Sequence, residues 1–175
     1  MSRSRPNLKL IDQPAAPATL ESVYRTHAAY VAGVVFKLLG RDHEIDDVVQ
    51  DVFLAASRGL EKVREPAAIK GWLATIAVRF SIRRLRQRRL RSFLGLDAVT
   101  ENEIAATPSG QEQRVLLARV YAVLDGLPAR DRVAWTLQHV EGESLERVAR
   151  MCGCSLATVK RRIASAQRSI ERVVS

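Results

Sequence analysis

Residues 142–170 read GESLERVARMCGCSLATVKRRIASAQRSI, and this stretch decides the fold of the C-terminal part of the chain. Ser144 and Ser155 each stand where a helix N-cap is favoured, because a serine hydroxyl accepts a hydrogen bond from a free backbone N–H of the first turn. Gly153 supplies the tight turn between the two helices. A short helix, a glycine turn and a longer helix are typical of a helix-turn-helix.

The second helix of this motif carries a basic face. Its apolar residues recur at helical spacing and should pack inward: Leu156, Val159, Ile163, Ala166 and Ile170. Residues in the first turns of a recognition helix reach base edges in the major groove. The candidate base-contacting residues are Ser155, Thr158, Lys160, Arg161, Arg162 and Ser165. An ordinary helical hairpin with a solvated basic face remains the alternative for this motif.

Helical periodicity extends through most of the chain. Apolar stripes run over 20–38, 45–56 and 69–80, and no segment shows a sustained period of two. The sequence therefore predicts an all-α protein. Stripe residues at the start of the chain include Leu20, Val23 and Tyr24, and Asp42 is a candidate N-cap for the second helix.

Two helical domains are expected, because the periodicity breaks in the middle of the chain. The stretch SFLGLDAVTENEIAATPSGQ holds two glycines, a proline and several acids, as a flexible linker does. The predicted boundaries are 1–18 for a disordered lead-in, 19–91 for a helical bundle, 92–111 for the acidic linker and 112–175 for the helix-turn-helix domain.

The chain is strongly basic, with a formal net charge of +9 over 175 residues. Such a charge indicates a polyanionic partner, either nucleic acid or an acidic membrane surface. No apolar run approaches the roughly 20 residues of a membrane span, and the first residues do not resemble a secretory signal. Cys152 and Cys154 are too few for a disulfide framework or a four-ligand zinc site. We expect a cytoplasmic protein with reduced thiols, no metal and no cofactor.

An acidic constellation lies within residues 46–53, which read DDVVQDVF. Asp47, Gln50 and Asp51 project together from the face opposite the apolar stripe. Like charges four residues apart repel, so this patch suggests a docking site for a basic partner. A solvated helix face is the alternative. Paired carboxylates can also serve acid–base chemistry, but no nucleophile or further ligand accompanies these, so an enzyme is not indicated.

An arginine run follows the third apolar stripe. Seven arginines stand between positions 79 and 91 with no acid among them, and they repel one another unless a polyanion is near. Neutralisation of DNA phosphates would explain the run. Trp72, on the apolar stripe just before it, is expected to be a packing residue.

Assembled in this order, the motifs resemble the extracytoplasmic-function branch of the sigma-70 family from about Leu20 to Val173. Residues 46–53 resemble the helix of that family that docks on the clamp helices of the polymerase β′ subunit. Residues 72–77 (WLATIA) and the arginine run resemble the regions that open and read the −10 element. Residues 141–145 (EGESL) and 153–160 (GCSLATVK) resemble the region that reads the −35 element.

The resemblance implies roles for individual residues. Contact with core polymerase is expected from Asp47, Gln50, Asp51 and Phe53. Contact with the −10 element is expected from Arg64, Lys70, Arg79, Arg83, Arg84 and Arg86. The −35 element is expected at the helix-turn-helix residues named above. The implied partners are the β′ clamp helices and β flap of core RNA polymerase, promoter DNA and a separate anti-sigma factor, with no membrane.

The sequence departs from the family pattern at several positions that bear on promoter choice, and two of them carry an arginine. Arg79 stands where the family usually has Asn, and Arg161 stands where it usually has a small residue. The main alternative is a helix-turn-helix regulator that acts without polymerase. That alternative leaves the acidic helix and the arginine run without a purpose.

Overall fold

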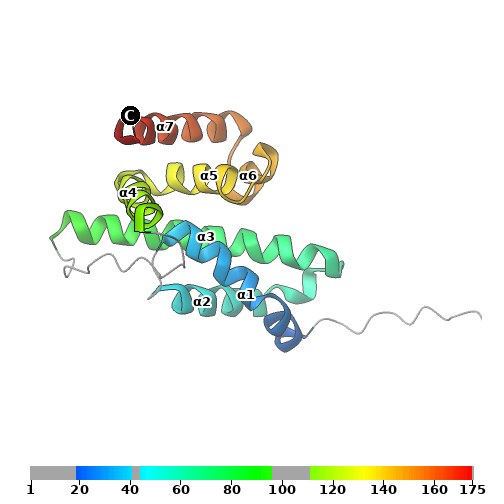
Figure 1. Cartoon of the computed structure of the whole chain (residues 1–175). Coiled ribbons are helices and arrows are strands. Elements are labelled where there is room, and N and C mark those ends of the chain that lie inside the picture. Colours follow the sequence, from blue (N-terminus) through cyan, green and yellow to red (C-terminus); the bar gives the residue numbers. More distant parts are fainter. Residues whose placement is uncertain (1–18, 41–43, 96–110, 175) are drawn as a thin grey trace, which may run out of the picture.

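The computed structural model describes residues 19–40, 44–95 and 111–174, with the backbone alone for 111–118 and 173–174. The all-α prediction is confirmed, since every regular element in these ranges is helical (Figure 1). The order is α1 (Leu20–Leu39), α2 (Ile45–Ser57), the short 3₁₀ helix η2 (Leu60–Lys62), α3 (Pro66–Phe93), α4 (Gln111–Gly126), α5 (Ala129–His139), α6 (Leu145–Cys152) and α7 (Leu156–Val174).

Helix α1 has a defined cap at each end. The Thr19 hydroxyl accepts a hydrogen bond from the Ser22 backbone N–H at 3.2 Å. At the other end Gly40 adopts φ 67° and its N–H donates to the Phe36 carbonyl at 2.7 Å. A left-handed glycine closes a helix without the steric cost that a side chain would bring. The chain therefore turns sharply at Gly40.

Helix α2 begins after Glu44, which occupies the N-cap position without a capping side-chain bond. Asp42, the N-cap predicted from the sequence, lies outside the described residues. The predicted apolar stripe of α2 is buried at Val48, Val52 and Ala56, among others, and packs against α1 and α3.

Helix α3 is the longest element, at 28 residues, and Pro66 stands at its first position. Proline suits this position because its missing N–H would have no partner there. The predicted stripe is buried at Ile69, Leu73 and Ala77. A second set of residues, not predicted from the sequence, is buried beside it: Ala74, Val78, Ser81, Ile82 and Leu85. Helices α5 and α6 contact α3 in addition to α1 and α2, so more of its circumference is covered.

The helix-turn-helix forms as predicted at its turn and caps. Ser144 accepts a hydrogen bond from the Arg147 N–H at 3.3 Å, and Ser155 accepts one from the Thr158 N–H at 3.2 Å. Gly153 adopts φ 60° between the two helices. Helix α7 then packs on α5, where Trp135 Nε1 donates to Gln167 Oε1 at 2.7 Å.

A single main core runs through both halves of the chain. It joins buried side chains of α1, α2 and α3, such as Val35 and Leu73, to those of α5, α6 and α7, such as Leu137 and Val148. A smaller cluster of Leu124, Leu127, Ala166 and Ile170 ties the end of α4 to α7. The two helical halves that the sequence predicts are therefore packed against each other (Figure 1).

Three residues expected in the core are exposed instead. Leu20 and Tyr24 lie at the start of α1 and face solvent, with Tyr24 51% exposed, although Val23 between them is buried. Leu156 is 36% exposed at the first position of α7, where a helical side chain points back over the preceding turn and away from the body of the helix. Helix ends are where an apolar stripe predicts burial least well.

We predict that Gly40→Ala destabilises the fold, since a left-handed alanine costs about 1–2 kcal/mol. A Cβ at Gly40 would also lie 2.5 Å from the Tyr121 ring. Gly33→Ala is the matched control, because a Cβ there meets nothing within 4 Å and alanine favours a helix interior by up to about 1 kcal/mol. Thermal unfolding followed by circular dichroism measures both. Equal effects at the two positions would contradict this account of Gly40.

Candidate nucleic-acid interface

The start of α7 presents a small group of hydroxyls and cations. The Ser155 and Thr158 hydroxyls share a hydrogen bond of 2.9 Å, so they are fixed relative to each other at the helix N-terminus. Lys160 and Arg161 are exposed on the next turn. These four residues form one accessible surface at the end of a helix whose positive dipole end favours anions.

Two other predicted base-contacting residues, Arg162 and Ser165, are half-buried, and Arg162 also forms a contact within the protein. Arg162 is half-buried, and its Nη1 donates to Cys154 Sγ at 3.2 Å. Ser165 is half-buried further along α7. The guanidinium of Arg162 therefore rests on the turn of the helix-turn-helix, whereas that of Arg161 is exposed to solvent.

Cys152, at the end of α6, is structural in character. Burial raises the pKa of the Cys152 thiol to about 11, so little thiolate exists there at neutral pH. Within the described parts of the chain, no three His, Cys, Asp or Glu side chains come together as a metal site.

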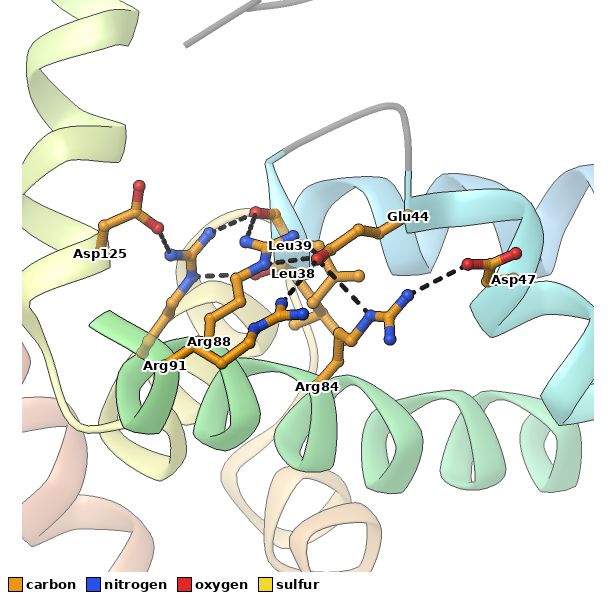
Figure 2. A network of polar contacts seen from close by, with 9 residues as sticks. Leu38, Leu39, Glu44, Asp47, Arg84, Arg88, Arg91 and Asp125 are labelled. Carbon is orange, nitrogen blue, oxygen red and sulfur yellow. Dashed lines mark hydrogen bonds and ion pairs between the residues drawn. The ribbon is translucent and has the colours of Figure 1, made fainter. Parts of the chain in front are cut away.

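The arginine run divides between two faces of α3. Arg79, Arg83, Arg86 and Arg89 are exposed. Arg84, Arg88 and Arg91 turn the other way and converge on Glu44, just before α2 (Figure 2). Because a helix turns 100° per residue, one run of arginines serves both an outer and an inner face.

Glu44 is the centre of the inner face, with its side chain only 7% exposed. Its carboxylate accepts a 2.6 Å hydrogen bond from Arg88 Nε, and it pairs with Arg84 Nε at 3.5 Å and Arg91 Nη2 at 3.7 Å. Burying a carboxylate is costly unless it is paired, and three guanidinium groups meet that need. The sequence analysis missed Glu44, although so many arginines on one helix require acidic partners.

Arg84 also reaches the predicted polymerase-binding helix. Its Nη2 lies 3.1 Å from Asp47 Oδ2 (Figure 2). A residue predicted to contact the −10 element and one predicted to contact polymerase are therefore partners in this structure.

The remaining predicted −10 residues lie at the start of α3 and before it. Arg64 is exposed in the loop after η2. Lys70 Nζ lies 4.4 Å from the centre of the Tyr30 ring of α1, a cation–π contact. The Lys70 ammonium group is thus directed toward α1.

Helix α2 carries the predicted polymerase-binding residues. Asp47, Gln50 and Asp51 are exposed together, as expected. Phe53 is buried, and its ring packs edge-on against Tyr24 with 4.8 Å between ring centres.

An open groove of about 480 Å³ runs beside this acidic face. It is mostly apolar, and its lining comes from α1 and α2: Leu20, Tyr24, Asp46, Val49, Gln50, Phe53 and Leu54. The sequence analysis expected Tyr24 in the core and did not name Leu54, and both are exposed. Leu54 is an apolar residue that lies outside the apolar stripe of α2. That position was the signal in the sequence that its side chain would be exposed.

Comparison with protein families identifies both halves of the chain. A model of sigma-70 region 2 matches residues 23–91, and a model of sigma-70 region 4 matches residues 117–168. We refer to these segments as region 2 and region 4. Region 2 thus comprises most of α1, with α2 and the arginine-bearing helix α3, and region 4 comprises most of α4 to α7.

Several curated relatives match along most of the chain. The ferric citrate uptake sigma factor FecI of Escherichia coli is 30% identical over 155 residues, covering 86% of this chain and 88% of that protein. The ECF RNA polymerase sigma-E factor of Haemophilus influenzae is 32% identical over 154 residues, covering 82% and 81%. The ECF RNA polymerase sigma factor SigE of Mycolicibacterium smegmatis is 32% identical over 159 residues, covering 87% of this chain and 60% of SigE.

Two solved structures share the fold. RpoE from Bartonella quintana, in complex with the anti-sigma factor NepR, superposes with a TM-score of 0.64 at 23% identity, covering 88% of this chain and 95% of that one. CnrH, in complex with the cytosolic domain of CnrY, gives a TM-score of 0.58 at 24% identity, covering 89% and 86%.

The chain therefore belongs to the sigma-70 family, in its extracytoplasmic-function branch. Proteins of this class act in transcription initiation as sigma factors, and this family is not one of catalytic enzymes. None of the helices described here has the length and apolar character that crossing a membrane requires.

We predict different effects for the two faces of α3. Arg88→Gln should lower the free energy of unfolding by about 2 kcal/mol, because it removes charged hydrogen bonds from a buried carboxylate. Arg83→Gln should change it by less than about 0.5 kcal/mol, as exposed substitutions do. Urea unfolding followed by circular dichroism measures both. A larger loss at Arg83 than at Arg88 would contradict the division of faces.

Proposed function

We propose that this sigma factor contacts core RNA polymerase through α2, the −10 element through the outer face of α3 and the −35 element through the start of α7. The observation that carries the proposal is the presence of the two family regions in their order along the chain. Each region also exposes a charged surface whose sign is opposite to that of its proposed partner. Promoter DNA is polyanionic and meets the cationic surfaces, while the acidic face of α2 suits a basic protein partner.

The domain boundaries follow this division. We propose a lead-in at 1–18, a polymerase- and −10-binding unit at 19–91, a linker at 92–111 and a −35-binding unit at 112–175. Residues 1–18 and 96–110 lie outside the described residues.

Polymerase docking is assigned to Asp47, Gln50 and Asp51, which are exposed on one face of α2. Buried Phe53 supports this face from below by holding Tyr24. The adjoining apolar groove supplies the surface that a helical partner such as the β′ clamp can cover. Asp51 forms no ion pair with the described residues, so its charge is available to a partner.

The −10 element is assigned to Arg64, Arg79, Arg83 and Arg86, which are all exposed. Arg84 and Lys70 support this surface from within region 2 through their contacts with Asp47 and Tyr30. Melting the −10 element extracts a base from the stack at a cost of a few kcal/mol, which contacts along the displaced strand must offset. The segment from Val63 to Lys70, with Arg79 behind it, is the proposed site for that base.

The −35 element is assigned to Ser155, Thr158, Lys160, Arg161, Arg162 and Ser165. Arg161 is the residue best placed for a base contact, because it is exposed near the start of α7. Arginine reads guanine through two parallel hydrogen bonds, so a guanine within the element is expected. The β flap of polymerase is the proposed protein partner of region 4.

We further propose that the chain acts in the cytoplasm without catalytic activity of its own, and that a separate anti-sigma factor regulates it. The structural relatives support the last point, since RpoE of Bartonella quintana and CnrH were each solved with such a partner or its cytosolic domain. A regulator that acts without polymerase is not favoured, because it has no need of region 2.

Transcription by a reconstituted holoenzyme tests the proposed function. Transcript start mapping after overexpression identifies the cognate promoter. Purified chain plus core polymerase should then initiate from that promoter and not from a scrambled one. If core polymerase initiated from that promoter equally well without the chain, the proposed function would be refuted.

Two substitutions separate the proposed surfaces. Asp51→Arg should weaken holoenzyme assembly about tenfold or more, since it reverses a charge that faces the basic partner. Arg161→Ser should leave assembly intact and relax base preference at one or two −35 positions by about 1–3 kcal/mol. Co-purification measures assembly, and transcription from single-base promoter variants measures preference. If Arg161→Ser weakened every −35 variant equally, Arg161 would be a phosphate contact.

A further inference from the structure

The exposed face of α3 continues past its arginines into an apolar end. Phe93 is 87% exposed, and Leu90 and Leu94 are each more than half exposed. The three side chains are neighbours on the helix surface, because they are separated by three or four residues or adjoin directly. This end of α3 extends beyond the other helices in Figure 1. Of the large apolar side chains in the described residues, that of Phe93 is the most exposed.

The last turn of α3 is closed by its own hydrogen bonds. The Leu94 N–H donates to the Leu90 carbonyl at 3.1 Å, and the Gly95 N–H donates to the Ser92 carbonyl at 3.0 Å. Gly95 adopts φ 66°, the left-handed conformation that commonly ends a helix. The Phe93 ring is therefore presented from a closed helical turn.

Phe93 lies on the same side of α3 as three of the exposed arginines. At 100° per residue, five exposed residues fall within a sector of about 80°: Arg79, Arg83, Arg86, Leu90 and Phe93. We call these five residues the α3 stripe. Arg88, which pairs with the buried Glu44, lies on the opposite side of the helix. The α3 stripe thus consists of three cations followed by two apolar side chains.

The composition of the α3 stripe fits single-stranded nucleic acid. Its guanidinium groups form no ion pair with the described residues, and they can neutralise phosphates. An aromatic ring gains stacking energy only where a base exposes its face, and in a duplex the faces are covered by the neighbouring base pairs. Cations beside an exposed aromatic ring are the two components of a site for unpaired nucleotides.

A protein partner fits the apolar end of α3 less well. A fully covered phenylalanine buries about 150–250 Å², and the two leucines beside it are smaller. A standard protein interface buries about 800 Å² on each partner. The apolar end is too small for such an interface, whereas a single base is enough to cover one ring.

The α3 stripe also has the length of a short single strand. The rise from Arg79 to Phe93 is about 21 Å at 1.5 Å per residue. A stacked strand advances about 3.4 Å per nucleotide, so the stripe accommodates about six nucleotides. The site proposed above for an extracted base, from Val63 to Lys70 with Arg79, adjoins one end of the stripe. Phe93 forms the other end.

We propose that Phe93, supported by Leu90, is a stacking site for a second unpaired base of the opened promoter, about six nucleotides from the base held near Arg79. This inference rests on the proposed −10 function of α3. The site holds the strand without reading its sequence, since every base has a face that can stack. It lengthens the contact with the single strand and so favours the opened promoter over the duplex.

Substitution of Phe93 in the full chain tests the stacking. Phe93→Ala should weaken binding of labelled oligothymidylate by at least about fivefold, the lower end of what one stacked base contributes. Phe93→Trp keeps an aromatic face and should retain at least the native affinity. Val140→Ala, at an exposed apolar position of region 4, is the matched control and should leave the affinity unchanged. Fluorescence anisotropy measures binding, and circular dichroism confirms that each variant is folded.

Two further readouts distinguish stacking from a loss of charge or of structure. Phe93→Ala should leave the affinity for a duplex of the same length unchanged, because the base faces of a duplex are covered. It should also leave the slope of log affinity against log salt unchanged, whereas Arg86→Gln should reduce that slope by about 0.7, the value of one phosphate contact. An equal loss for single strand and duplex would overturn the stacking site. So would an unchanged affinity for the single strand, including the case in which Phe93→Ala weakens holoenzyme assembly instead.

Abasic substitution locates the stacked base. The holoenzyme is bound to a fork-junction DNA of the cognate promoter, from which one base at a time is removed along the displaced strand. The affinity should fall at the extracted base and at a second position about six nucleotides away. At that second position Phe93→Ala should cause no additional loss, because the base and the ring form one contact. Additive losses at every position would overturn the assignment.

The two assays separate this proposal from the proposed function. Oligothymidylate binding by the free chain requires neither polymerase nor a promoter. Transcription by the native holoenzyme requires both. A chain that transcribes with core polymerase but binds oligothymidylate equally well with and without the Phe93 ring would retain its function and lose the stacking site.

Discussion

The C-terminal end of α1 is the point on which the rest of the structure depends. A helix end carries unpaired carbonyls and a partial negative charge. The Leu39 carbonyl accepts hydrogen bonds from both Arg88 and Arg132, which lie 49 and 93 residues after it in the sequence. Gly40 turns the backbone away in a left-handed conformation and leaves space for the Tyr121 ring. Region 2 and region 4 therefore meet at one helix terminus.

The buried arginines need compensation of a kind that surface arginines do not. Burial lowers the pKa of Arg132, because it disfavours the charged form, and the Asp125 carboxylate opposes that effect. Burial likewise raises the pKa of the Tyr121 hydroxyl, against the opposing charge of Arg132. A buried ion pair contributes little net stability, but breaking it is costly. Such pairs favour one arrangement of the regions over many loosely packed ones.

The sequence predicted the elements better than their association. Helix periodicity and the serine caps identified α6 and α7, because both signals are local. Helices α5 and α6 cover α3 through tertiary packing, which a local signal does not predict. A second apolar row of Ala74, Val78 and Ile82 was nevertheless present in the sequence. Seven arginines in one run predicted DNA contact for all of them, whereas three of them pair with the buried Glu44 carboxylate, and of these Arg91 stays half-exposed. The charge of a residue does not tell whether it lies on the inner or the outer face of a helix. Its angular position around the helix axis does.

Because α3 is continuous, the number of residues between two positions fixes the angle between their side chains around the helix. Packing residues, inner arginines and outer arginines share one uninterrupted helix from Pro66 to Phe93. Inserting or deleting one residue between Leu73 and Arg79 would turn everything beyond by about 100°. Arg88 would swing away from Glu44, and an exposed arginine would enter the core. Substitutions of the exposed arginines leave these angles unchanged, whereas a change of length in this helix alters them.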